Sequence, residues 1–301
     1  MSGYDLAIAY RIYPKVSKPA LGLPFSDDKR QLAEICVRSL KESLGSLRAR
    51  MWVLLDACPD DYAAIFEKYF SPGDLTFIRL PGVGNQATFA KQIDLLLEQS
   101  DSEFVYFAED DYIYLPGQFP RMLQFINVNT GVDFISPYDH LDCYTLDIHD
   151  RPKWIRVSAG HHWRTAASTC LTFLTRKETL SQTEKQFRTY CRRNYDFSMW
   201  LALTKQSIFN PWQAATFLYR QPLFAKVIVK AWLYGWNQIL FGSRMQLWVP
   251  VPGIATHLDI EAMSPNIEWR SLLARYGQDL AIDKLDRGST EIASARFCSG
   301  F

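Results

Sequence analysis

The sequence predicts an α/β fold in which a mostly parallel, Rossmann-like sheet is flanked by helices. Short apolar runs alternate with helix-length segments through the first half of the chain, which is typical of parallel strands joined by crossover helices. One such run, residues 104–108, is followed at once by three acids, Glu109, Asp110 and Asp111. Ligands of open α/β sheets bind outside the carboxyl ends of the strands, so we expect these acids to face a ligand.

Strands and helices are expected to alternate strictly through the first half of the chain. Strands are expected over residues 5–9, 51–55, 75–80 and 104–108. Helices are expected after the capping residues 26–28, after residues 58–61 and after the turn 81–85, and the first of them should end at Gly45. This order brings Tyr10, Arg11, Asp56 and the three acids to one edge of the sheet.

The turn Gly82-Val83-Gly84 matches neither of two common phosphate-binding motifs. It lacks the third glycine of a dinucleotide fingerprint, and it follows the third strand rather than the first. No Gly-Lys-Ser/Thr sequence follows it, so it is not a P-loop either. Any phosphate site therefore has to come from another combination of residues.

Composition limits the class of partner. The chain has 301 residues, of which 48% are hydrophobic, so it can bury a large core. Its formal net charge of +1 gives no global field for nucleic acid, and a phosphate ligand has to be held locally. The six cysteines have no paired spacing and indicate reduced thiols. With no signal peptide visible, we expect a cytoplasmic protein.

The three adjacent acids point to a cation. Neighbouring carboxylates repel one another and resist full ionisation unless a positive charge compensates them. A hard divalent ion, Mg²⁺ or Mn²⁺, can hold carboxylates and phosphate oxygens together. The simpler alternative is a solvated acidic turn after a core strand.

Four segments together resemble the nucleotide-sugar-dependent glycosyltransferases of the GT-A fold, and most closely glycosyltransferase family 2. They are the strand ending Tyr10-Arg11, the strand ending at Asp56, the helix containing Ala90-Lys91-Gln92, and the run ending in the three acids. The resemblance covers roughly residues 5–114. It implies a GT-A-like sheet with residues 1–135 binding the nucleotide sugar, and an elaborated, aromatic-rich acceptor-binding and catalytic half over 136–301.

The resemblance also implies roles for individual residues. Asp111 is expected to bind the metal directly, with Asp110 near the ribose or the metal and Glu109 supporting through water. The expected donor-binding residues are Tyr10, Arg11, Asp56 and Lys91. The alternatives are that Asp56 ends a strand in a turn and that Lys91 is a solvated helix residue.

In the second half, strands are expected over residues 133–136 and 168–174, with a helix over 176–190. The segment before the second of these strands holds His161, His162 and Arg164. Arg164 is expected to meet a donor phosphate or sugar hydroxyls. The two histidines should point to opposite faces, so at most one reaches the cleft.

Asp196 is the expected general base. A helix is expected to start there, and the chemistry needs one carboxylate within hydrogen-bond reach of the attacking hydroxyl. Inverting members of the resembled family place a Glu-Asp pair at such a position, whereas this chain has Tyr195-Asp196. Asp196 could instead serve only as a helix cap, with Asp142 and Asp139 as substitute bases.

Thr256-His257, after a Pro-Gly turn, resembles the late segment that completes the metal sphere in several GT-A enzymes. His257 is therefore an expected metal ligand, and imidazole favours manganese. The alternative is a histidine with a purely structural role.

The aromatic region over residues 211–248 is expected to be mostly core, with one or two rings available to stack on a sugar. Within it, residues 223–241 are apolar enough for a helix at a membrane surface. Lys226 and Lys230 interrupt the run, so a membrane-spanning helix is not expected.

The expected function is a metal-dependent, inverting glycosyltransferase of glycan or polysaccharide biosynthesis. The donor is expected to be a nucleotide sugar, with UDP favoured by its frequency in the resembled family, and the acceptor a carbohydrate or a lipid-linked molecule at the inner face of the membrane. One alternative is a sugar nucleotidyltransferase, since the loop after the first strand contains Lys15, Lys18 and Gly22. The other is a non-catalytic carbohydrate-binding protein.

Overall fold

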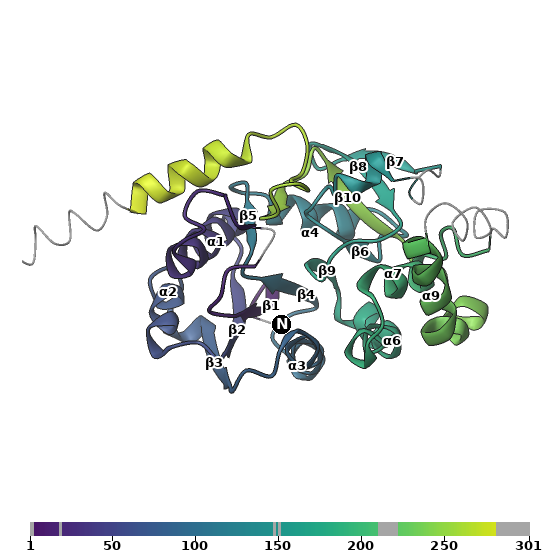
Figure 1. The fold of residues 1–301 in the computed structure, drawn as a ribbon, viewed down its shortest axis with the longest axis horizontal. Helices are drawn as coiled ribbons and strands as arrows, with labels where there is room; N and C mark the ends of the chain where they lie inside the picture. Colours follow the sequence, from purple (N-terminus) through teal and green to yellow (C-terminus); the bar gives the residue numbers. More distant parts are fainter. Residues whose placement is uncertain (1–2, 18–19, 147–148, 150–151, 210–221, 281–301) are drawn as a thin grey trace, which may run out of the picture.

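The predicted α/β fold with a mostly parallel sheet is confirmed. The structure is a computed structural model, and it describes residues 3–17, 20–146, 149, 152–209 and 222–280. In this part of the chain one nine-stranded sheet has the order β3-β2-β1-β4-β9-β6-β10-β8-β7, and a second sheet pairs β11 with β5 (Figure 1). The halves 1–135 and 136–301 both contribute strands to the large sheet, and their division of labour remains a prediction.

The first half follows the expected alternation. Its strands in the large sheet are β1 (Leu6–Ile12), β2 (Ala49–Asp56), β3 (Leu75–Leu80) and β4 (Phe104–Glu109), all parallel to one another. Its helices are α1 (Lys29–Leu44), α2 (Ala63–Glu67) and α3 (Asn85–Glu98), with single 3₁₀ turns at Asp60–Tyr62 and Pro72–Asp74. The helix expected after residues 58–61 is therefore shorter than the sequence suggested, because two 3₁₀ turns flank it.

The first helix begins and ends as its sequence predicts. The Asp28 side chain accepts a hydrogen bond from the Gln31 N–H at 3.0 Å, which satisfies one of the unpaired donors of the first turn. Gly45 ends the helix with a φ of 59°, a conformation that costs glycine little. Both signals are local, so the sequence alone was sufficient to place α1.

The second half extends the sheet with strands of both directions. Its elements are α4 (Phe119–Val128), β6 (Phe134–Ile135), α5 (Asp142–Thr145), β7 (Ile155–Ser158), β8 (His161–Ala166), β9 (Phe173–Arg176), α6 (Lys177–Phe187), the 3₁₀ turn Tyr190–Arg192, α7 (Asp196–Thr204), α9 (Pro222–Phe241) and β10 (Leu247–Val251), and residues 269–280 are also helical. Strand β9 runs antiparallel to β4 and β6, and β8 runs antiparallel to β10 and β7. Residues 210–221, at the start of the aromatic region, lie outside the described residues.

The strand expected over residues 168–174 is wrong in position. The structure has β8 before this range and β9 starting only at Phe173. Between them, Thr169 donates to the Ser136 hydroxyl at 2.7 Å and Thr172 donates to Glu109 at 2.8 Å. Side-chain hydrogen bonds of this kind compete with ladder pairing, and the sequence pattern does not show them.

Alternating residues of β1 face two different helix layers. Leu6, Ile8 and Tyr10 belong to one hydrophobic cluster, which also contains buried residues of α1, α2 and α4. Ala7 and Ala9 belong to a second cluster with α3, α6 and α7. The sheet is thus covered on both faces, and a side chain at its edge belongs to one face or the other.

The small second sheet joins distant parts of the chain. Strand β5 (Tyr112–Tyr114) directly follows the acids, and it pairs antiparallel with β11 (Ala255–His257). In this register His257 lies opposite Tyr112, and the Leu258 N–H donates to the Asp111 carbonyl at 2.7 Å. This pairing places a late histidine beside the last of the three acids.

Candidate active site

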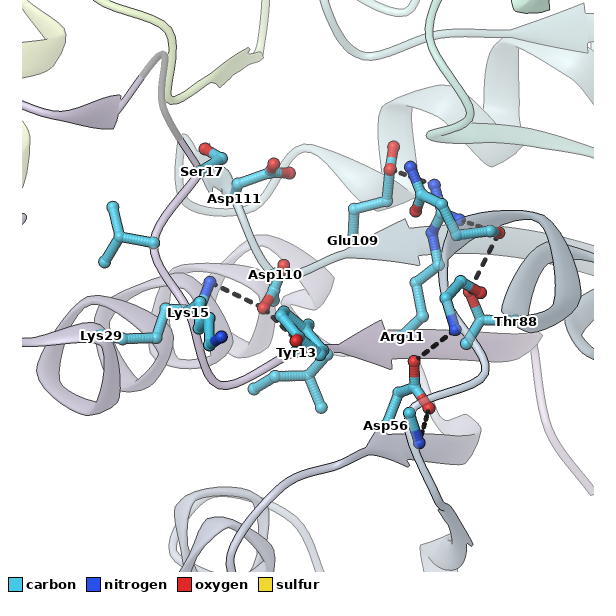
Figure 2. A pocket seen from close by; sticks show the side chains of 15 residues that line it. Arg11, Tyr13, Lys15, Ser17, Lys29, Asp56, Thr88, Glu109, Asp110 and Asp111 are labelled. Atoms are coloured by element: carbon cyan, nitrogen blue, oxygen red, sulfur yellow. Dashed lines mark hydrogen bonds and ion pairs between the residues drawn. The ribbon is translucent and has the colours of Figure 1, made fainter.

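A pocket of about 460 Å³ opens at the carboxyl ends of β1, β2 and β4, where the sequence placed it (Figure 2). Its walls come from the end of β1 and the loop after it, the starts of α1 and α3, the glycine turn and the three acids. The lining residues are Arg11, Ile12, Tyr13, Lys15, Val16, Ser17, Lys29, Asp56, Gly82, Gly84, Asn85, Thr88, Glu109, Asp110 and Asp111. Three basic and four acidic side chains thus share one hollow.

Asp111 and His257 form a charge pair at this pocket. The His257 Nε2 atom lies 3.1 Å from Asp111 Oδ2. Burial alone would raise the pKa of Asp111, but His257 outweighs it and lowers that pKa to about 2. Burial alone would lower the pKa of His257, but Asp111 raises it to about 9. At neutral pH both partners are therefore charged.

The pair fits a divalent cation. The second Asp111 oxygen, Oδ1, is buried and has no hydrogen-bond partner in the structure. A buried carboxylate oxygen is costly to leave unpaired, so it calls for a ligand. Among the described residues, no group of three or more His, Cys, Asp and Glu side chains is arranged to hold a metal. Mg²⁺-type ions bound with phosphates use few protein ligands and complete their sphere with phosphate oxygens and water, which suits a two-residue site.

Glu109 has two partners within the protein. One carboxylate oxygen forms an ion pair with Arg11, and the other accepts the Thr172 hydroxyl at 2.8 Å. Arg11 also donates to the Asn85 carbonyl at 2.9 Å, and its guanidinium lies on the pocket wall. Burial opposes the charge on Arg11, but Glu109 outweighs it and raises the pKa of Arg11. Glu109 therefore holds Arg11 in place on the pocket wall, and its expected support of a metal through water stays a prediction.

Asp110 secures the loop that follows β1. Its Oδ2 atom lies 2.7 Å from Lys29 Nζ and accepts the Tyr13 N–H at 3.1 Å. Burial raises the pKa of Asp110 in spite of the nearby Lys29. The lysine, the loop and Asp110 itself all line the pocket, so Asp110 holds two parts of its wall together (Figure 2).

Asp56 lines the pocket, but its carboxylate accepts hydrogen bonds from the protein's own backbone. It accepts hydrogen bonds from the N–H groups of Gly82, Val83 and Gly84 at 2.9, 2.8 and 2.9 Å. Both oxygens are occupied, and Asp56 is only 3% exposed. Asp56 thus orders the glycine turn that forms one wall, and its expected contact with a nucleotide base or ribose stays a prediction.

Three expected donor-binding residues lie away from the pocket. Tyr10 is fully buried and packs edge-to-face on Phe66 at 5.1 Å, because it faces the opposite layer of the sheet from Arg11. Lys91 lies on α3 outside the set of lining residues. Arg164 is buried in an ion pair with Asp139 on β8, so its charge is already compensated. The structure does not place these three side chains at the pocket, and their donor-binding roles stay predictions.

Asp196 begins α7 and faces a second cleft of about 460 Å³. The lining residues are Gln86, Tyr190, Arg193, Asn194, Tyr195, Asp196 and Lys230. Asn85 lines the first pocket and Gln86 the second, so the two hollows adjoin at the start of α3. Burial raises the pKa of Asp196, and the Glu109 carboxylate adds to this effect. Asp196 is the first residue of α7, and its carboxylate also accepts the Phe197 N–H at 2.7 Å.

The two alternative bases, Asp139 and Asp142, differ in whether a substrate can reach them. Asp139 is fully buried, bound by Arg164 and by the Tyr144 hydroxyl at 2.6 Å, and so cannot reach a substrate. Asp142 is half exposed, lies 3.5 Å from His140 Nδ1, and lines a smaller hollow of about 150 Å³ that also contains Asp196. Asp142 therefore stays open as a rival to Asp196.

The sequence reasoning missed several functional side chains. Lys29 and Thr172 hold the acids, and Tyr13 and Ser17 line the pocket. The position of Lys29 directly after the Asp28 cap, at the start of a helix beside the first strand end, was the one signal that could have identified it. Thr172 had no local signal, since its contact with Glu109 spans 63 residues.

One protein-family model matches this chain. The model described as Glycosyl transferase family 2 matches residues 28–199. This range includes α1, Asp56, the glycine turn, all three acids and Asp196. No curated protein sequence matches the chain.

Three solved structures with a similar course of the chain are distant from it in sequence. The galactosyltransferase LgtC, in complex with donor and acceptor sugar analogues, is 12% identical, with a TM-score of 0.44 over 91% of this chain and 95% of that one. Staphylococcus aureus TarS is 12% identical, with a TM-score of 0.41 over 81% and 60%. Glucosyl-3-phosphoglycerate synthase of Mycobacterium tuberculosis, with Mn²⁺, UDP and phosphoglyceric acid, is 10% identical, with a TM-score of 0.40 over 76% and 79%. Likeness at this level does not establish a shared activity.

Replacing Asp56 by Ala should destabilise the protein by about 2–4 kcal/mol, because three backbone N–H groups of the glycine turn lose a charged acceptor. Urea denaturation measures this loss, and hydrogen exchange should show faster exchange at residues 82–84. Asp60→Ala is the matched control, because that side chain is exposed, and it should change stability by less than about 0.5 kcal/mol. Unchanged protection of residues 82–84 in the Asp56 variant would contradict the assigned role.

In the metal-free protein, the Asp111–His257 pair should stabilise the fold fully only within a limited pH range. His257, raised from 6.5 to about 9, stabilises the fold fully below pH 6.5 and loses this contribution as the pH rises through about 9. Asp111, lowered from 3.8 to about 2, stabilises it above pH 3.8 and loses this contribution as the pH falls through about 2. NMR titration should find the His257 ring changing charge near pH 9, and much lower in Asp111→Asn. A ring that titrates at the same pH in both proteins would show that the pair does not form.

Proposed function

Because this chain belongs to glycosyltransferase family 2, we propose that it transfers a sugar from a nucleotide-sugar donor to an acceptor hydroxyl. The observation that carries the proposal is the Asp111–His257 pair, with its buried unpartnered oxygen, at the edge of a pocket that also holds basic side chains. Such a site suits a diphosphate with its cation. We favour a UDP-sugar as the donor.

The donor diphosphate is assigned to the pocket at the strand ends. Its volume of about 460 Å³ falls within the range of small-molecule sites. Arg11, Lys15 and Lys29 line it as hydrogen-bond donors. Arg11 and Lys29 are each paired with an acid of the pocket, and Arg11 is held in a fixed orientation by Glu109 and by the Asn85 carbonyl. A guanidinium fixed in this way binds phosphate without losing much side-chain freedom.

Asp111 and His257 are the residues that would hold Mn²⁺ or Mg²⁺. When bound, the ion would supply positive charge to the leaving diphosphate. The protein's own contribution is to keep the Asp111 carboxylate ionised, since His257 holds its pKa at about 2. The mixed oxygen and imidazole donor set favours manganese over calcium.

Asp196 is assigned as the base that takes the proton from the acceptor hydroxyl, in a single inverting displacement. It lines the second cleft, and it is close enough to Glu109 of the donor pocket for that carboxylate to raise its pKa. A raised pKa makes a carboxylate a better proton acceptor at neutral pH. The acceptor, a carbohydrate or a lipid-linked molecule of glycan or polysaccharide biosynthesis, would then lie in the second cleft.

One observation supports a sugar nucleotidyltransferase as a second candidate. Lys15, in the loop after β1, lines the donor pocket as a triphosphate-binding lysine would. Lys18 lies outside the described residues, and Gly22 is not part of the pocket lining. Release of nucleoside diphosphate from a nucleotide sugar supports the transferase, and release of pyrophosphate from a nucleoside triphosphate supports this alternative.

Two variants separate donor binding from turnover. Asp111→Asn should abolish the thermal stabilisation that Mn²⁺ with UDP gives the wild type, because the buried oxygen then carries no charge. Asp196→Asn should keep that stabilisation and lower the rate of UDP release by about a hundredfold or more, the contribution usual for a general base. Asp142→Asn is the matched control at the neighbouring hollow and should keep both properties.

The results for these variants distinguish between the two candidate bases and between the candidate functions. Loss of turnover in Asp142→Asn with a fully active Asp196→Asn would move the base to Asp142. No stabilisation of the wild type by Mn²⁺ with any nucleoside diphosphate would contradict the donor site and favour a non-catalytic carbohydrate-binding protein.

A further inference from the structure

The outer face of α9 is an apolar stripe. Val229, Leu233, Trp236 and Leu240 are 61%, 68%, 54% and 52% exposed among the described residues. Their spacing of four, three and four residues places them along one side of the helix. Large apolar side chains gathered in this way mark a contact surface more often than ordinary solvent-facing surface.

The stripe faces outward because the other side of α9 is packed tightly against the protein. Ala231 and Ile239 are fully buried on that side, in a cluster with Leu201 and Ala202 of α7. Gly235 leaves no space for a larger residue, since a Cβ there would lie 2.6 Å from the Ala202 Cβ. The orientation of α9 about its own axis is therefore fixed. Figure 1 shows α9 at the outer edge of the fold, beside α7 and α6.

The charged residues of α9 and its surroundings favour an anionic partner. The helix contains no acid, and its two lysines, Lys226 and Lys230, lie one turn apart along one edge of the stripe. Arg193, in the turn before α7, is exposed nearby and lines the second cleft together with Lys230. An apolar face bordered by basic residues is typical of a helix that lies in the interface of an anionic membrane.

The stripe also adjoins the proposed acceptor cleft. Lys230 Nζ donates to the Arg193 carbonyl at 2.6 Å and lies 3.6 Å from the centre of the Tyr195 ring. Both residues line the cleft that contains Asp196. A surface that receives α9 would therefore lie at the mouth of this cleft.

We propose that α9 lies on an anionic lipid surface through this stripe, so that the cleft takes acceptors carried by lipids. The choice of acceptor rests on the proposed transferase function, whereas the membrane contact does not. In the described part of the chain no helix has the length and apolarity needed to cross a bilayer, so the contact is peripheral. A second copy of the chain is a weaker candidate, because a symmetric contact would bring the lysines of two α9 helices together.

Sedimentation with vesicles tests the contact without any donor. The wild type should sediment with vesicles of phosphatidylcholine mixed with phosphatidylglycerol, more weakly with phosphatidylcholine alone, and less at high salt. Leu233→Gln combined with Trp236→Gln should lower the partition coefficient at least about tenfold, since two large apolar side chains no longer enter the lipid. Val128→Gln, at an exposed valine of α4, is the matched control and should bind as the wild type does.

A second variant tests the charge separately. Lys226→Glu leaves the stripe intact and should weaken binding to the anionic vesicles while leaving the weaker binding to phosphatidylcholine unchanged. The proposal is overturned if the wild type sediments with neither vesicle, if the double variant binds as tightly as the wild type, or if the stripe instead supports concentration-dependent self-association that the double variant abolishes. Because the readout is vesicle binding, its failure leaves the transferase proposal intact, and loss of transfer in Asp196→Asn leaves the membrane proposal intact.

Discussion

The pairing of β5 with β11 is the constraint on which the site depends. It places Asp111 against His257 across 146 residues of sequence, and the Leu258 N–H fixes the register by donating to the Asp111 carbonyl. A largely buried carboxylate beside an imidazolium is costly to assemble, and replacing such a pair with apolar residues often stabilises a fold. The retained charge and the unpartnered Asp111 oxygen are therefore better explained by a ligand than by stability.

Each of the three adjacent acids has its own cationic partner. Arg11 pairs with Glu109, Lys29 with Asp110 and His257 with Asp111. The sequence argument was that the acids need a divalent cation; the protein itself supplies a cationic partner for each acid, and the metal stays a prediction. Only Asp111 keeps a free buried oxygen, so the three acids divide into two that build the pocket and one that is available to a metal.

The local sequence pattern predicted the helices and strands of the first half well. It did not predict which distant residues contact the site side chains. Strand and helix alternation, the Asp28 cap and Gly45 were sufficient for β1 to β4 and their helices, because each signal lies within a few residues. The ring of Tyr10 faces the core because side chains alternate between the two faces of β1, and the sequence did not show which face meets the pocket. The partners of Asp56 and Arg164, a backbone turn and a buried aspartate, lie far away in the sequence, so the local pattern could not show these contacts. The roles left to Asp196 and His257 came from the resemblance and remain predictions.

Anomalous diffraction from crystals grown with Mn²⁺ and UDP examines the central claim most directly, because it locates the ion and the diphosphate independently of turnover. The account predicts one manganese peak within bonding distance of Asp111 and His257, with the diphosphate in the pocket lined by Arg11 and Lys29. A manganese ion bound elsewhere, with the Asp111–His257 contact unchanged and the pocket empty of nucleotide, would contradict it.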